Sequence, residues 1–249
     1  MSKSDETNAR HDVEAGDDSY LASLSDLMVG MLFIFIIMLM AFALSYTSAT
    51  NAANSQSAAL KCLLTRNQQK LTDLLSQIST NFNEQLGSDT RIQVDESKNV
   101  LRMEDSVLFD KGKSELRDAG KDAVHGLADI LSRVLPESRS IIEGIYVEGH
   151  TDNDPVIGGS NWKLSTDRAI TTFQELINAH DDLGKMLNAD RQEIFGVSGY
   201  GEQRPVAENT TEVEKQKNRR IDMRFTLRVP TTGEVQKAMF EAPNVKGGC

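Results

Sequence analysis

The longest apolar stretch of the chain runs from Leu27 to Leu44 (LMVGMLFIFIIMLMAFAL) and contains no charged or hydrogen-bonding side chain. It is about as long as a helix must be to cross roughly 30 Å of hydrocarbon. A cleaved signal peptide has a shorter apolar core, about 7–15 residues, behind a basic flank, whereas the flank here is mostly acidic. The pattern therefore predicts a permanent transmembrane helix over residues 20–46, preceded by a tail of residues 1–19.

Residues 47–88 follow the membrane helix and divide into a linker and an amphipathic helix. The linker TSATNAANSQSAA is small, polar and uncharged, which is typical of an extended or partly helical connector. Beyond it, apolar residues recur at steps of three, four and seven, which place them on one helical face. These residues are Leu60, Leu63, Leu64, Leu71, Leu74, Leu75, Ile78, Phe82 and Leu86. The stripe could pack on the following domain, form a two-stranded coiled coil between copies, or lie on the membrane as a regulatory segment.

From residue 89 to residue 249 the pattern is that of a mixed α and β domain. Apolar and alternating runs predict strands at Arg91–Glu96, Val100–Glu104, Ser140–Glu148, Glu193–Tyr200 and Arg220–Val229. Helical spacing predicts helices at Lys113–Leu135, stopped by Pro136, and at Leu164–Ala179, with a helical turn at Thr211–Lys217. Helices between strands indicate crossovers that cover one face of a sheet.

Composition excludes several classes of function. The chain carries 27 basic and 37 acidic residues, a formal charge of −10, so it lacks the positive charge that direct nucleic-acid binding needs. Two cysteines, Cys62 and Cys249, cannot build a disulfide scaffold; a bridge within the chain, a bridge between copies and two free thiols all remain open. The histidines have no metal-ligand spacing, and the partial phosphate-loop and nucleophile-elbow patterns are incomplete. We therefore expect no enzyme activity, cofactor or metal.

Five ordered sequence blocks connect the domain to a known family. They are Leu108-Phe109-Asp110, Gly149–Asp152 (GHTD), Leu164–Ala169 (LSTDRA), Gly199–Pro205 (GYGEQRP) and Asn218–Asp222 (NRRID). In this order they resemble the OmpA-like peptidoglycan-binding domain. The resemblance implies an α+β fold, β-α-β-α-β-β, with helices on a small mixed sheet. It also implies a single-pass protein of the bacterial inner membrane with a cytoplasmic N-terminus and a periplasmic C-terminal domain, although the flanking Lys and Arg residues lean weakly the other way.

The same resemblance implies a site for the zwitterionic end of diaminopimelate in the wall peptide. Asp152 of GHTD would take the ammonium group, and Arg168 of LSTDRA the carboxylate, which a planar guanidinium can hold by two parallel hydrogen bonds. Four further residues would shape or support the pocket: Thr151, Asn161, Leu164 and Arg220. The alternative is an internal Asp152–Arg168 ion pair that closes a strand–helix junction. The five blocks together favour binding.

Asp26 lies inside the predicted membrane helix, close to its start. An ionised Asp at the bilayer centre costs about 2.5–3.5 kcal/mol on insertion scales, so such a residue indicates a functional role. Ser25 or Asp26 could instead cap the helix at the interface, but residues 20–24 already fit a helix before them. The segment SDLMVGMLFIFIIM resembles the membrane helix of MotB-type stator subunits, which implies that Asp26 carries the translocated proton.

The MotB resemblance implies partners as well as a function. It implies a homodimer inside a five-membered ring of a MotA-like multi-pass membrane subunit, anchored to peptidoglycan. The acidic N-terminal tail, the SDLM start and the chain length are most similar to the ZorB stator subunits of Zorya anti-phage defence systems, whose partner ring is of the ZorA type. We therefore expect a proton-driven rotary stator subunit in anti-phage defence. A flagellar-type stator subunit and a passive tether between inner membrane and cell wall are the alternatives.

Overall fold

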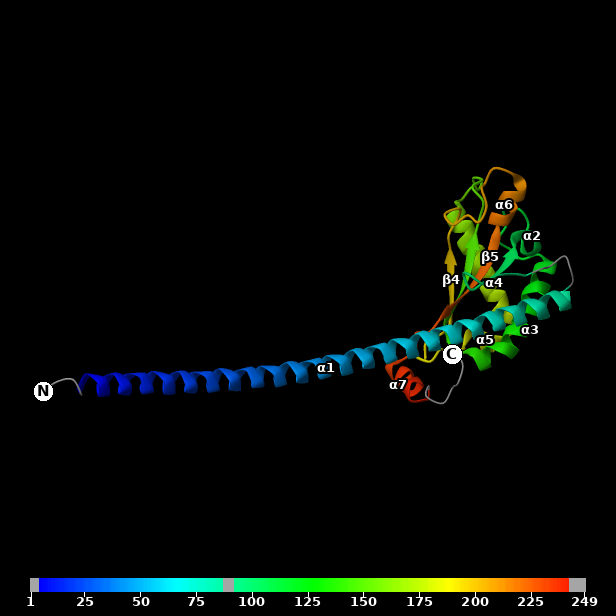
Figure 1. Cartoon of the computed structure of the whole chain (residues 1–249). Helices are drawn as coiled ribbons and strands as arrows, with labels where there is room; N and C mark the ends of the chain where they lie inside the picture. Colours follow the sequence, from blue (N-terminus) through cyan, green and yellow to red (C-terminus); the bar gives the residue numbers. More distant parts are fainter. Residues whose placement is uncertain (1–4, 87–91, 242–249) are drawn as a thin grey trace. The chain divides into compact units, whose positions relative to one another are not determined.

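The computed structural model describes residues 5–86 and 92–241, and it describes side chains for residues 23–86 and 92–240 (Figure 1). The chain divides into two compact units, Met1–Ala59 and Leu60–Cys249. The elements are α1 (Asp5–Leu86), β1 (Gln93–Asp95), β2 (Val100–Glu104), α2 (Asp105–Leu108), α3 (Asp118–Ser138), β3 (Ile142–His150), α4 (Asn161–Ala179), α5 (Asp181–Gly184), β4 (Phe195–Gly199), α6 (Glu212–Asn218), β5 (Arg220–Leu227) and α7 (Thr232–Glu241). Cys249 lies outside the described residues.

The first unit consists of the N-terminal part of α1. Every side chain from Leu27 to Leu44 is exposed, and α1 is the one helix within residues 5–86 and 92–241 that is long and apolar enough to cross a membrane. The linker predicted after this stretch is helical throughout. Thr50 Oγ1 donates to the Tyr46 carbonyl at 3.0 Å, so a linker hydroxyl satisfies its hydrogen bond without leaving the helix.

The second unit is built on a five-stranded sheet with the order β1-β2-β5-β3-β4. β3 and β4 run parallel, and the other neighbours run antiparallel. The register sets Leu101, Met223 and Val147 side by side across β2, β5 and β3. All three are fully buried in one apolar core with residues of α3 and α4. The mixed sheet with its packed helices agrees with the mixed α and β domain that the sequence predicts.

The opposite face of the sheet carries charged side chains. Arg102, Asp222 and Glu148 alternate with the apolar residues of β2, β5 and β3. Arg102 Nε donates to Asp222 Oδ1 at 2.8 Å. Arg224 donates to both carboxylate oxygens of Glu148, each at 2.8 Å. Because each buried charge has a partner, the sheet centre accommodates polar side chains.

The predicted amphipathic helix forms the part of α1 that belongs to the second unit. Its apolar stripe enters the domain core through Leu71, Leu74, Leu75, Ile78 and Phe82. Asn83 adds a polar contact, because its side-chain oxygen accepts from the Ile92 N–H at 2.9 Å and its amide donates to the Ile92 carbonyl at 3.3 Å. The stripe therefore packs on its own domain, which is the first of the three interpretations.

The boundaries of α3 differ from the prediction at both ends. The helix begins later, at Asp118, because the preceding residues are held in a turn in which the Arg117 N–H donates to the Leu108 carbonyl at 3.0 Å. It also continues past Pro136 to Ser138. A proline removes one backbone hydrogen bond, and in the last turn this loss does not end the helix. The short helices α2, α5 and α7 lie outside the predicted elements.

Candidate functional site

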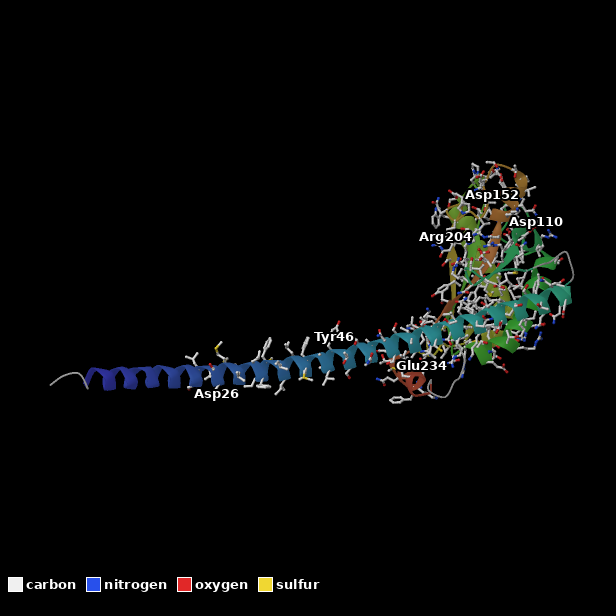
Figure 2. The ribbon with its side chains drawn as sticks, viewed as in Figure 1. Asp26, Tyr46, Asp110, Asp152, Arg204 and Glu234 are labelled. Atoms are coloured by element: carbon white, nitrogen blue, oxygen red, sulfur yellow. The ribbon has the colours of Figure 1, made fainter. Side chains whose placement is uncertain are left out.

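A cleft of about 330 Å³ opens where the turn after β3, the start of α4 and the junction between α6 and β5 meet. It is lined by Lys111, Gly112, Thr151, Asp152, Asp154, Pro155, Val156, Ile157, Asn161, Leu164, Arg168 and Arg219. Figure 2 labels Asp152 in this region of the second unit. The fold thus brings together five of the six predicted wall-binding residues, all except Arg220.

The end of β3 and the start of α4 approach so closely that only glycine fits between them. A Cβ on Gly149 would lie 1.9 Å from the carbonyl oxygen of Ser165. The Thr151 N–H donates to the Gly201 carbonyl at 3.0 Å, which holds the turn after the strand. Asp152 follows this held turn, and its position in the cleft is therefore set by backbone packing.

Asp152 is 6% exposed, and its carboxylate is paired within the chain. One oxygen, Oδ2, lies 2.5 Å from Arg219 Nη1, and the other, Oδ1, accepts from the Asp154 N–H at 3.1 Å. Arg219 also lies 2.6 Å from Glu212. Burial lowers the pKa of Arg219, but its hydrogen bonds to Asp152 and Glu212 outweigh burial and raise it. Arg219 therefore has a second anionic partner when a cation approaches Asp152.

Arg168 is 2% exposed and is held from several sides. Its Nη1 lies 2.9 Å from Asp105 Oδ1, its Nε donates to the Lys113 carbonyl at 2.7 Å, and its guanidinium lies 5.1 Å from the centroid of the Phe109 ring. Burial lowers the pKa of Arg168, and the Asp105 charge opposes that shift. Asp152 and Arg168 are thus both held in ion pairs within the chain, with Arg219 and Asp105 and not with each other.

Asn161 lines the cleft and holds its side-chain oxygen buried. Its amide nitrogen donates to the carbonyl of Asp154 at 3.1 Å and to that of Asp152 at 3.4 Å. These two bonds fix which end of the side chain is nitrogen. The oxygen, Oδ1, is buried and has no hydrogen-bond partner among the described residues. A buried acceptor of this kind favours a ligand that brings an N–H donor.

The two adjacent arginines of the NRRID block have different surroundings. Arg220 is 3% exposed and lies outside the cleft: its Nε donates to Asp222 at 2.9 Å and its Nη2 to the Arg204 carbonyl at 3.1 Å. Arg219 is the C-cap residue of α6 and lines the cleft instead. The sequence signal was the pair of arginines, but the choice between them depends on where α6 ends and β5 begins.

Asp26 belongs to the first unit, where Figure 2 labels it on α1. α1 begins at Asp5, so Asp26 is inside the helix and is not its N-cap. Its side chain is exposed on the helix surface. Asp26 is the one acidic or basic residue between Ser23 and Leu44, and the residues that follow it up to Leu44 are apolar.

The sequence comparison agrees with the geometry of the second unit. Residues 108–219 match the model of the OmpA family. The chain carries an OmpA-like domain. Motility protein B of Bacillus subtilis is 34% identical over 127 residues, which are 50% of this chain and 43% of that protein. Outer membrane porin F of Pseudomonas aeruginosa is 34% identical over 125 residues, which are 49% of this chain and 31% of that protein.

The chain thus spans less than half the length of these curated relatives. Among solved structures, a MotB-like protein from Desulfovibrio vulgaris is similar to 67% of this chain, with a TM-score of 0.52 and 22% sequence identity, over 99% of its own length. At this identity the likeness concerns the fold. The OmpA-like fold expected from the five blocks is confirmed, and an N-terminal apolar helix before such a domain fits a single-pass inner-membrane protein.

Proposed function

We propose that this protein is a proton-driven stator subunit of the MotB type that is anchored to peptidoglycan. α1 spans the inner membrane with the N-terminus in the cytoplasm, Asp26 carries the proton, and the OmpA-like domain binds the wall in the periplasm. The observation that carries the proposal is the cleft itself, in which Asp152 and the unpartnered oxygen of Asn161 lie with Arg168 and Arg219.

The cleft has the polarity that the zwitterionic end of diaminopimelate requires. The ligand ammonium binds Asp152 and donates a further hydrogen bond to Asn161 Oδ1, which has no partner among the described residues. The ligand carboxylate binds Arg168, whose Nη2 is 3.4 Å from the Asp110 carbonyl and so retains donor capacity. Leu164 supplies an apolar wall for the methylene chain. Hydrogen bonds to charged groups contribute about 1.5–3 kcal/mol each, which suits a specific anchor.

The membrane part works through neutralisation of Asp26. Protonation removes the charge, so the side chain can enter a drier part of a surrounding ring, and release of the proton on the other side completes a step. A potential of 100 mV supplies about 2.3 kcal/mol per elementary charge. The partner is a five-membered ring of a MotA-like multi-pass subunit around a dimer of this chain.

The biological role proposed for the motor is anti-phage defence of the Zorya type, with this chain as the ZorB-like subunit and a ZorA-type ring as its partner. The acidic tail and the SDLM start of the membrane helix support this role by resemblance. The similarity to motility protein B supports a second candidate, a flagellar-type stator subunit. A passive tether is the third, and it needs no titrating residue at position 26.

Sedimentation with isolated peptidoglycan sacculi tests the wall site. The detergent-solubilised full chain should sediment with sacculi, and Asp152→Asn should weaken binding roughly tenfold or more because one charged hydrogen-bond partner is lost. Asp167→Asn is the matched control, since Asp167 lies on α4 next to Arg168 but pairs with Lys163 on the surface, 2.6 Å away. Equal binding by the wild type and Asp152→Asn would refute the zwitterion site.

Co-purification and two functional assays test the motor and its role. A tagged chain should co-purify with a multi-pass membrane protein if it belongs to a stator, and should purify alone if it is a passive tether. Expression of the pair should protect cells from phage in the defence case. Restored swimming in a strain without its flagellar stator, with no protection from phage, would instead establish the flagellar-type candidate.

A further inference from the structure

Asp105 is a buried acid that lies outside the five OmpA-like sequence blocks. It is the first residue of α2, directly after β2, and is 5% exposed. Its carboxylate Oδ1 lies 2.9 Å from Arg168 Nη1. Its backbone N–H donates to the Arg219 carbonyl at 3.0 Å. One residue therefore contacts both arginines that line the cleft.

The charged groups around Asp105 come from three other segments. Arg168 reaches it from α4, Arg219 lies between α6 and β5, and Asp152 lies in the turn after β3. Burial raises the pKa of Asp105 to about 6, the charges of Arg168 and Arg219 oppose this shift, and the charge of Asp152 adds to it. Asp105 therefore changes its charge near pH 6, well above the range of an exposed aspartate.

A ligand carboxylate changes the balance of charge at Arg168. The guanidinium is 2% exposed and has Asp105 as its ion-pair partner within the chain. A second carboxylate at the same guanidinium places two anions close together in a site with little water. Like charges at such a distance favour protonation of one of them. Asp105 is the one already biased toward its neutral form by burial.

We propose that Asp105 is a positioning residue for Arg168 and Arg219, and that it takes up a proton when a wall-peptide carboxylate binds Arg168. The inference rests on the proposed wall-binding function and adds a linkage between binding and pH. A proton from solvent forms an O–H bond on the Asp105 carboxylate, and no electron transfer is involved. After uptake, the ligand carboxylate replaces Asp105 as the anionic partner of Arg168, and the protonated carboxyl group of Asp105 remains beside it.

The sign of the linkage follows from the direction of the proton. Since the bound state holds more protons than the free state, affinity must rise as pH falls. The rise begins above the pKa of free Asp105, which is about 6, and levels off below it, where both states are already protonated. If binding takes up one proton, the affinity can change by at most tenfold for each pH unit.

Titration calorimetry on the wild-type full chain tests proton uptake directly. The probe is free meso-diaminopimelate, added at pH 6.5 in two buffers with different ionisation enthalpies, so that the difference in heat counts protons. We expect net uptake of up to one proton, and an affinity that increases severalfold between pH 8 and pH 6. Binding without uptake and without pH dependence would overturn this inference while leaving the wall-binding function intact. Absence of binding at every pH would overturn both.

The Asp105→Asn variant then assigns the proton to this residue. Asn keeps the size and an oxygen that can accept from Arg168, but it cannot titrate. We expect a flat pH profile, with an affinity at pH 8 at least equal to that of the wild type at pH 6. A pH dependence that persists in Asp105→Asn would assign the proton to another group, such as buried His150, and refute the proposal. If the variant does not fold, the wild-type calorimetry still decides.

A surface histidine provides the matched control for the pH profile. His125 pairs with Glu175 at 2.6 Å on an exposed surface, and neither residue lines the cleft. His125→Gln removes this surface ion pair but should leave both the proton count and the affinity profile unchanged. Loss of the profile in His125→Gln would mean that the pH dependence comes from the surface and not from Asp105.

Discussion

Among single residues, Asp26 discriminates between a motor and a tether. It is the one charged side chain between Ser23 and Leu44. Asp26→Asn keeps the size and hydrogen bonding of the side chain while removing its titration. We therefore expect normal membrane insertion and partner co-purification, but no proton flux into vesicles and no protection in plaque assays. Ser25→Ala, which removes the neighbouring polar side chain, serves as the control and should retain activity. Full phage resistance with stably expressed Asp26→Asn would exclude the proton-carrier role.

Substitutions of the adjacent arginines Arg219 and Arg220 should affect different properties, peptidoglycan binding in one case and the stability of the domain in the other. Arg220 is buried with Asp222, and removal of one partner of a buried ion pair costs about 3–5 kcal/mol. Arg220→Gln should therefore lower the unfolding free energy by roughly that amount, measured by denaturant titration. Arg219→Gln should cost less stability because its side chain is 18% exposed, but it should weaken sedimentation with sacculi. The reverse pattern would place Arg220 in the binding site.

Among the elements, α1 has a different role in each unit. In the second unit its stripe is part of the domain core, and Phe82 is fully buried there. Phe82→Ala should lower the unfolding free energy of the domain by about 3–5 kcal/mol, since a large core side chain is removed. Leu64→Ala, on the same helix but 40% exposed, should cost much less. If Phe82→Ala left stability unchanged but abolished dimerisation, the stripe would instead be a coiled-coil interface.

At the scale of the whole molecule, the proposed stator function requires both units. Torque on a ring requires one part to be held still, and a membrane helix without a wall anchor would turn with its partner. The unit boundary at Ala59 gives a suitable place for truncation, because a chain ending at Leu86 would expose the stripe that the domain normally buries. A chain ending at Ala59 should co-purify with the MotA-like partner but give no protection against phage. Protection equal to that of the full chain would make wall anchoring dispensable.

Several elements could be predicted from the sequence because their signals are local. β2 has the predicted bounds, Val100–Glu104, since its apolar residues form a short run between polar ones. The cap of α7 is also local: Thr231 and Glu234 bond reciprocally, the Glu234 N–H to Thr231 Oγ1 at 3.3 Å and the Thr231 N–H to the Glu234 carboxylate at 2.7 Å. This Thr-x-x-Glu signature of a helix start is visible in the sequence. The membrane helix and the five OmpA-like blocks were equally visible.

The sequence by itself determined the apolar helix, the mixed domain and the identity of Asp152 and Arg168 as candidate partners of a zwitterion. Only the tertiary structure decided that Arg219, and not Arg220, lines the cleft, and that Asp105 is the partner of Arg168. The physical reason is the range of the interactions. Periodicity, caps and turns depend on neighbours in the chain, whereas a buried charge takes its partner from whichever distant segment the packed sheet and helices bring within about 3 Å.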